Sequence, residues 1–151
     1  MDENVSPLTA HLGFWMRMVS NQISQSFAAK VAGRGVTVAE WAVMRALLGR
    51  EPLAPSQLAG EMGLSRGAIS KLCDRLVAKG LVSRAGGFED GRARRVGLTA
   101  AGAALVPELA QLADRNDAEF FGCLSEEERE ALGRLLRMMV ERRGISAVPV
   151  D

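Results

Sequence analysis

Residues 65–76 read SRGAISKLCDRL, and their spacing is that of a helix with one apolar and one polar face. Four apolar residues lie at positions i, i+3, i+4 and i+7 and are expected to face inward: Ile69, Leu72, Cys73 and Leu76. The outward face, with Arg75 at its edge, carries Arg66, Gly67, Ser70, Lys71 and Asp74. Ser65 is expected to cap this helix, which should end near Lys79. Its arginine, lysine and serine side chains can donate hydrogen bonds to phosphates and guanine edges, and its glycine permits close approach to a groove.

The segments on either side of this helix complete a known motif. A short helix is expected from Ser56 to Met62, with Pro55 at its first position, and Gly63 ends it. Ala54 stands where a serine or threonine cap would start that helix better. After the basic helix the apolar period changes to two, which predicts strands at 81–85 and 94–98 around a glycine-rich turn. A short helix, a turn, a basic helix and a β-hairpin, in that order, predict a winged helix-turn-helix.

The rest of the chain is predicted to be helical. Residues 8–32 form a long amphipathic helix, and a capping box at 37–40 opens a second helix that ends near Gly49. Thr99 should cap another helix that reaches about Gly122 and bends at Pro107. A capping box at 125–128 starts the last helix, and the final eight residues are expected to be frayed.

We therefore expect a mainly α fold in which residues 37–99 form the winged helix-turn-helix lobe. Residues 1–36 and 100–151 are expected to form a helical dimerisation region. Their helices carry more apolar residues than a small lobe can cover, and an exposed stripe of that size normally marks an interface.

Charge is distributed unevenly, although the chain as a whole is close to neutral at +1. Residues 65–95 hold eight basic and three acidic residues, a net charge of +5, whereas the remainder holds eleven basic and fifteen acidic ones, −4. The basic part includes Arg92, Arg94 and Arg95 in and beside the hairpin loop, where Asp90 is placed to orient Arg92. A narrow minor groove attracts inserted arginine. The alternative is that these basic residues only form a charged surface in contact with water. This alternative would explain the polar face of the helix, but not why the hairpin that follows it is also basic.

Several classes of protein are excluded or disfavoured. The 151 residues suit one compact domain, their apolar runs are too short for a membrane span, and the N-terminus lacks the basic and apolar regions of a signal peptide. Two cysteines, Cys73 and Cys123, and one histidine support neither a disulfide framework nor a four-ligand zinc site. No catalytic constellation occurs, since even Ser70 and Lys71 are adjacent on a helix and cannot face each other. We expect a cytoplasmic protein that is not an enzyme and uses no cofactor, metal or membrane.

The basic helix, the segment Gly80–Arg84, the wing sequence Asp90-Gly91-Arg92 and residues 96–102 together resemble the MarR-type regulators. Residues 37–48 and 58–65 also fit, and the resemblance covers roughly residues 8–143. It implies an obligate homodimer and a repressor that binds palindromic operators. Such repressors often release double-stranded DNA when a small, frequently aromatic or anionic, ligand binds. The resemblance further implies that Arg92, held by Asp90, enters the minor groove. The residues that would contact the major groove or its phosphates are Ser65, Arg66, Ser70, Lys71 and Arg75.

Other residues are open to more than one interpretation. Cys73 is expected to be a small buried hydrophobe rather than a redox sensor, and Cys123 is expected to be more exposed. A ligand cavity is expected between the first long helix and the lobe, with His11, Trp15 and Arg45 as candidate contacts. Core or dimer packing is the expected role of Trp41, and it is also the alternative to ligand contact for Trp15. The alternative function is a winged-helix module that binds a protein partner without recognising a DNA sequence.

Overall fold

The computed structural model describes residues 4–85 and 94–151, and within them the chain is mainly helical with one antiparallel hairpin. The helices are α1 (Leu12–Ala32), α2 (Val38–Leu47), α3 (Pro55–Met62), α4 (Arg66–Ala78), α5 (Ala100–Phe121) and α6 (Glu126–Arg143). The strands are β1 (Val82–Ala85) and β2 (Arg95–Leu98). The predicted mainly α, winged helix-turn-helix fold is confirmed.

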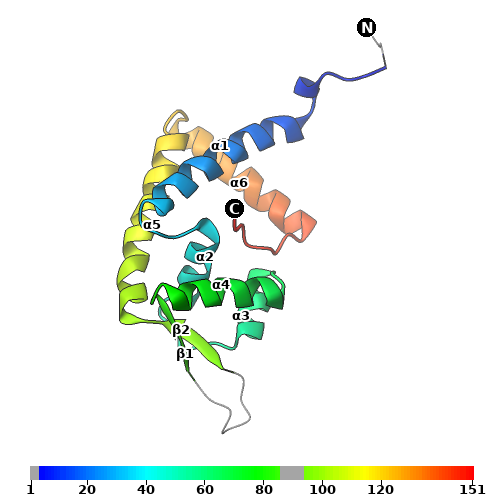
Figure 1. Cartoon of the computed structure of the whole chain (residues 1–151). Helices are drawn as coiled ribbons and strands as arrows, with labels where there is room; N and C mark the ends of the chain where they lie inside the picture. Colours follow the sequence, from blue (N-terminus) through cyan, green and yellow to red (C-terminus); the bar gives the residue numbers. More distant parts are fainter. Residues whose placement is uncertain (1–3, 86–93) are drawn as a thin grey trace.

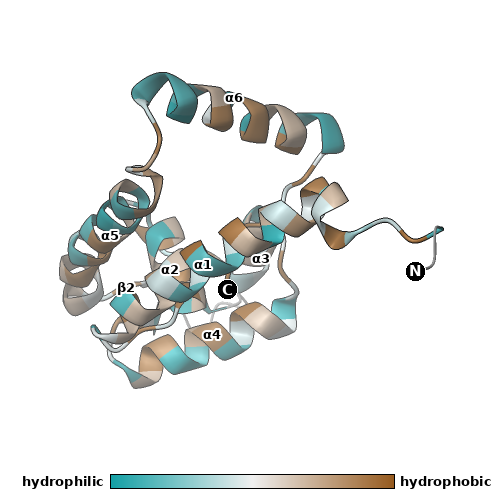
Figure 2. Cartoon of the chain, turned by 90° about the horizontal axis from the view of Figure 1, so that it is seen from above, coloured by the Kyte–Doolittle hydropathy of each residue, from teal (hydrophilic) through white to brown (hydrophobic). Residues whose placement is uncertain are grey.

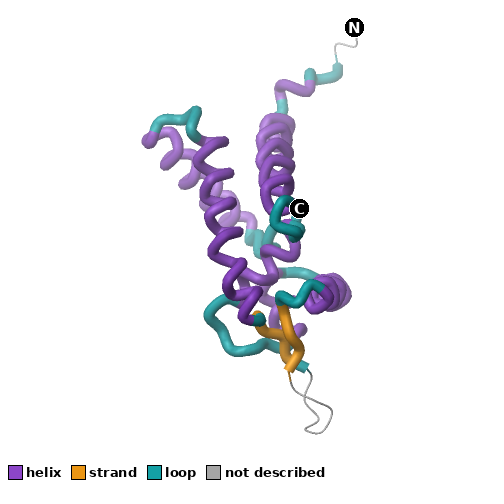
Figure 3. Tube along the Cα trace, turned by 60° about the vertical axis from the view of Figure 1, so that its left-hand side comes forward, coloured by secondary structure: helices purple, strands orange, loops and turns teal. Residues whose placement is uncertain are grey.

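The elements form a lobe with helical arms (Figure 1). Helices α2, α3 and α4 and the hairpin lie at one end, while α1 and α5 pack together and lead away from the lobe toward α6. Figure 3 shows the two strands at the end of the molecule away from the α5–α6 turn. One hydrophobic core joins the two parts, since Val31 of α1 and Leu109 of α5 are buried with Met44, Leu58 and Ile69 of the lobe.

Local capping chemistry sets the helix starts as predicted. Thr37 and Ser125 each accept a hydrogen bond from the backbone N–H three residues on, and the glutamate there binds back, which makes two capping boxes. Ser65 and Thr99 cap α4 and α5 with their hydroxyl groups. Ala54 supplies no side-chain cap to α3, whose first residue is Pro55. Helix α5 continues through Pro107.

The hairpin is joined to the lobe by a contact that sequence periodicity did not predict. Strands β1 and β2 pair from Val82 opposite Leu98 to Ala85 opposite Arg95. Leu53, in the loop before α3, forms an isolated bridge with Val96, in which each N–H donates to the other carbonyl at 2.9 and 2.7 Å. The base of the wing is therefore held by the loop between α2 and α3.

Three boundary predictions need correction. The first long helix begins at Leu12 rather than Leu8, because His11 adopts an extended conformation after a short 3-10 turn at Leu8–Ala10. Helix α2 ends at Leu47, two residues before Gly49. The residues after α6 have no regular structure, but they are not frayed: the Val148 N–H donates to the Met62 carbonyl at 3.0 Å. Apolar burial explains this docking, since Val150 packs against the core.

Large apolar side chains remain exposed on the helical arms. Figure 2 shows hydrophobic positions, in brown, along the ribbons of α1 and α6. On α1 they are Leu12, Trp15, Met16, Met18 and Val19, and on α6 they are Leu135, Leu136, Met139 and Val140. Leu12 is 83% exposed. A single exposed leucine is common, but a series of exposed apolar residues along one helix normally marks an interface. None of the helices in the described part of the chain combines the length and apolar character needed to span a bilayer.

Candidate nucleic-acid interface and ligand cavity

Helix α4 presents the two faces that the sequence predicts. Ile69, Leu72, Cys73 and Leu76 are buried. The six outward residues are exposed: Arg66, Gly67, Ser70, Lys71, Asp74 and Arg75. The hydroxyl of Ser65 accepts from the Ala68 N–H at 3.1 Å, so its role in the structure is to cap the helix. The outer face of α4 thus carries four donor side chains, which we call the donor row: Arg66, Ser70, Lys71 and Arg75. The buried apolar side of α4 anchors this row in the lobe.

An ion pair that is buried on the Glu40 side fixes the C-terminal end of α4. Lys79, which follows the helix, places its ammonium nitrogen 2.8 Å from the Glu40 carboxylate and donates to the Gly35 carbonyl at 2.8 Å. The Glu40 side chain is fully buried, and the Thr37 N–H also donates to it at 2.9 Å. Burial raises the pKa of Glu40, but the hydrogen bonds from Lys79 and Thr37 outweigh it, so the pKa lies below the usual value. The sequence identified Glu40 only as a capping residue.

A second ion pair joins α4 to the wing. The Arg84 guanidinium on β1 donates to the Asp74 carboxylate on α4 at 2.5 Å. The charge of Asp74 is therefore paired with the hairpin. The sequence predicted only that Asp74 is one of the outward polar residues. This contact holds α4 against β1, so that the outward face of α4 and the hairpin lie side by side.

The wing residues are only partly covered by the structure. Arg95 is exposed and opens β2, opposite Ala85, and Arg94 precedes it and is also exposed. Asp90 and Arg92 lie outside the described residues, so their role in the minor groove stays a prediction.

The loop before α3 is fixed by a third ion pair. Arg50 binds both carboxylate oxygens of Glu61, on α3, at 2.7 and 3.1 Å, and Gln57 donates to the same carboxylate. The hydrogen bonds from Arg50 and Gln57 lower the pKa of Glu61 to about 2. More than a third of each side chain is exposed, so this pair orients α3 more than it stabilises the fold.

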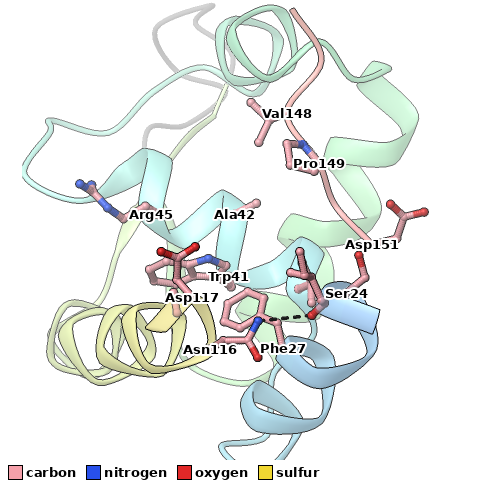
Figure 4. Close-up of a pocket in the computed structure, with 13 residues that line it drawn as sticks. Ser24, Phe27, Trp41, Ala42, Arg45, Asn116, Asp117, Val148, Pro149 and Asp151 are labelled. Carbon is pink, nitrogen blue, oxygen red and sulfur yellow. Dashed lines mark hydrogen bonds between the residues drawn. The ribbon is translucent and has the colours of Figure 1, made fainter. Parts of the chain in front are cut away.

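A cavity of about 400 Å³ lies between α1, α2, α5 and the segment after α6 (Figure 4). Its wall is mainly apolar, with Phe27 and Trp41 in edge-to-face contact at 6.5 Å between ring centroids. Arg45 and Asp117 are the exposed charged residues that α2 and α5 contribute to its lining, and Val148, Pro149 and Asp151 come from the segment after α6. This volume is within the range of small-molecule sites, roughly 300–1,000 Å³.

Asn116 connects this cavity to the packing of the arms. Its side chain is buried, donates to the Ile23 carbonyl at 3.3 Å and accepts from Lys30 at 3.0 Å. Lys30 also binds Ser26 and Glu119, so these polar groups hold α1 against α5. Both the amide oxygen and the amide nitrogen of Asn116 are therefore hydrogen-bonded within the chain.

The structure brings one of the three candidate ligand contacts to this cavity. Arg45 lines it, whereas His11 and Trp15 lie at the start of α1 and bind the carbonyls of Leu8 and Thr9. Trp41, which we expected to serve packing, also lines the cavity. The sequence places one aromatic residue of this wall on each of two neighbouring helices. That Phe27 and Trp41 meet depends on how α1 and α2 cross, which only the structure shows.

The cysteines are placed as the sequence suggests. Cys73 is buried in the core, and burial raises the pKa of its thiol, which disfavours the reactive thiolate. Cys123 is exposed at the α5–α6 junction.

The comparison with known proteins identifies the family. The model described as MarR family matches residues 34–93, from the loop before α2 into the wing. Transcriptional regulator HosA of Escherichia coli O157:H7 is 31% identical over 105 residues, which are 70% of this chain and 78% of HosA. The chain belongs to the MarR family. It is thus a DNA-binding transcriptional regulator, and the resemblance noted in its sequence is confirmed.

Solved structures of transcriptional regulators share the fold. A probable transcriptional regulator from Pseudomonas aeruginosa is 28% identical, with a TM-score of 0.77 over 88% of this chain and 99% of that one. A cysteine-to-serine mutant of MarR from Escherichia coli, in complex with operator DNA, is 27% identical, with a TM-score of 0.75 over 85% of this chain and 93% of that one.

Proposed function

We propose that this MarR-family protein is a homodimeric repressor that binds a palindromic operator and is controlled by a small aromatic or anionic ligand. The observation that carries the proposal is the Asp74–Arg84 contact, which sets the exposed donor row of α4 beside the wing. A helix for the major groove and a basic hairpin for the backbone or minor groove can then engage the same duplex.

The donor row supplies the contacts with DNA. Arg66, Ser70, Lys71 and Arg75 are exposed on α4, and in our proposal they meet bases and phosphates of the major groove. Arg94 and Arg95, beside the wing, and Arg92, oriented by Asp90, add contacts with the neighbouring phosphates and minor groove. The related MarR–operator complex supports this assignment, because its fold is the same over most of both chains.

The exposed apolar residues of α1 and α6 support dimerisation. We propose that residues 1–36 and 100–151 pair with the same residues of a second copy and that residues 37–99 form the DNA-binding lobe. A two-fold dimer would place its two α4 helices in successive major grooves, about 34–36 Å apart. The operator should therefore be an inverted repeat.

The cavity is the proposed ligand site. Phe27 and Trp41 give an aromatic wall, and the lining also holds one positive side chain, Arg45, and two carboxylates, Asp117 and Asp151. Aromatic ligands match the wall because their rings pack on apolar side chains, and an anionic group on such a ligand would pair with Arg45.

The decisive experiment is a selection of genomic fragments by the purified protein, followed by footprinting and binding titrations at several salt concentrations. We expect a protected inverted repeat, nanomolar-range affinity that falls steeply with salt, and enrichment of the gene's own upstream region if it regulates itself. Arg92→Ala should weaken operator binding at least several-fold without changing the melting temperature. If Arg92→Ala binds the operator as tightly as the unchanged protein, the wing is not part of the DNA interface.

The alternative function, a module that binds a protein with an acidic surface, predicts a different result. Such a module would bind all fragments weakly and leave no footprint. Arg115→Ala is a matched control for either case, because Arg115 is exposed on α5, outside the recognition motif.

A further inference from the structure

The segment after α6 touches two functional parts of the molecule at once. Val148, Pro149 and Asp151 line the cavity, as Figure 4 shows for their side chains. Ala147 and Val148 also contact the end of α3 and the turn that leads into α4. Figure 1 shows this segment, in red, returning from α6 to the lobe. We call residues 145–151 the returning segment.

The contact with α3 is a helix cap. The last carbonyls of a helix have no partner within it. At the end of α3, the Gly63 N–H donates to the Gly60 carbonyl and the Leu64 N–H donates to the Ala59 carbonyl. The Met62 carbonyl accepts from the Val148 N–H at 3.0 Å. The returning segment therefore satisfies a backbone group at the turn of the helix-turn-helix.

The packing at this turn is close. Gly63 has φ of +67°, and a Cβ added to it would lie 2.8 Å from the Cα of Ala147. No larger residue than glycine fits here while the returning segment is docked. Gly63 thus meets two requirements, a left-handed turn and room for a second chain segment.

We infer that the returning segment connects the cavity to the turn before the recognition helix, so that a ligand in the cavity tightens this turn through it. The inference rests on the proposed ligand site. A ligand that fills the cavity contacts Val148 or Pro149 and stabilises the docked segment, and the docked segment caps α3. By thermodynamic linkage, the docked segment must raise the association constant of the ligand by the same factor by which the bound ligand raises the equilibrium constant for docking.

The docking itself can be tested without ligand or DNA. Because the chain has two tryptophans, Trp15→Phe leaves Trp41, in the cavity wall, as the reporter. In this background, removal of residues 145–151 should raise the acrylamide quenching constant of Trp41 about twofold. Amide exchange at Leu64 should accelerate about fivefold, since the end of α3 loses a hydrogen bond.

A matched pair of point variants separates the cap from general loss of packing. Val148→Pro removes the donating N–H, whereas Val148→Ala keeps it and trims the side chain. We expect Val148→Pro to accelerate exchange at Leu64 as the deletion does, and Val148→Ala to leave it nearly unchanged. Unchanged Leu64 exchange and Trp41 quenching in the deletion variant would overturn the inference, as would equal exchange in the two Val148 variants.

Benzoate serves as the aromatic-acid probe for the coupling. Titration followed by Trp41 fluorescence should show at least threefold weaker binding to the deletion variant than to the full chain. Equal binding to both would overturn the coupling. Failure of the full chain to bind aromatic acids would instead count against the proposed ligand site. The exchange and quenching experiments test the docking of the returning segment without ligand, so the two failures can be told apart.

Discussion

The ammonium group of Lys79 lies 2.8 Å from the carboxylate of Glu40, whose side chain is fully buried. Lys79 follows the last turn of α4, and Glu40 lies in the first turn of α2. Because Lys79 also binds the Gly35 carbonyl, one side chain joins the recognition helix to α2 and to the loop after α1. This anchor fixes the direction in which α4 offers its donor row.

Lys79→Met should destabilise the protein by about 3 kcal/mol, because it leaves a buried carboxylate without its counter-charge. Adding Glu40→Gln should recover more than half of the loss, since the neutral amide can still accept the Thr37 N–H. The measurement is urea unfolding at one protein concentration. Lys71→Met is the control, and its effect should stay within about 0.5 kcal/mol because Lys71 is exposed.

The same pair predicts a pH dependence. The pKa of Glu40 in the folded protein lies below its usual value of 4.5, so the stability it contributes is present above that value and is lost as the pH falls. In Lys79→Met, burial raises the pKa of Glu40, so protonation favours the folded state. The stability difference between the two proteins should therefore narrow from pH 7 to pH 4. A difference that widens would contradict this account.

Lys71→Ala should weaken binding to all DNA sequences alike and reduce the salt dependence. Each lost phosphate contact lowers the slope of log K against log salt by about 0.9, or about 1.8 for a dimer with both copies on DNA. Fluorescence anisotropy between 50 and 200 mM salt measures the slope, with Arg115→Ala as the control. An unchanged slope would place Lys71 away from the phosphates.

The predictions from sequence succeeded where the determining chemistry is local. The caps at Thr37, Ser65, Thr99 and Ser125 depend on residues three positions apart, and the inward face of α4 depends on helical periodicity alone. Contacts between distant segments were missed. Periodicity does not reveal the bridge between Leu53 and Val96. The terminal position of the last eight residues suggested a frayed end, but Val148 hydrogen-bonds to Met62 and Val150 packs against the core.

The cavity shows the same division. Its position between α1 and the lobe was predicted, and so was Arg45 at its edge. The predicted contacts His11 and Trp15 lie elsewhere, at the start of α1. There the His11 ring is hydrogen-bonded to the Leu8 carbonyl and the Trp15 indole N–H donates to the Thr9 carbonyl. Which aromatic residues meet across two helices depends on their crossing, and this is a tertiary property.

Gly67→Ala should separate stability from DNA binding. Gly67 is the second residue of α4, and an added Cβ would meet nothing within 4 Å, so alanine should stabilise the fold by about 0.5 kcal/mol. In the proposed complex the same methyl group holds the helix away from the groove and should weaken operator binding about tenfold. Gly13→Ala is the control, since Gly13 is the second residue of α1 with equally open surroundings. Similar DNA affinity in both variants would argue against close approach at Gly67.

Leu12→Glu should dissociate the proposed dimer. A charge replaces a leucine that is 83% exposed in the single chain but would be buried between two copies, so the dimer dissociation constant should rise at least 100-fold. Sedimentation velocity measures this change. Asn21→Glu, exposed on the opposite side of α1 by helical periodicity, should leave the dimer intact. A Leu12→Glu protein that stays dimeric would move the interface away from α1.

Gly63→Ala should report how strongly the returning segment docks. Alanine at φ of +67° costs about 1 kcal/mol in backbone strain, and its Cβ would also clash with Ala147. In the full chain we therefore expect a loss of about 2 kcal/mol, because the segment must shift or detach. In a chain without residues 145–151 only the strain should remain. Gly49→Ala is the matched control: Gly49 has φ of +71° and open surroundings, so its penalty should be the same in both backgrounds. If Gly63→Ala behaves like Gly49→Ala, with one penalty in both chains, the segment does not rest on the turn in solution.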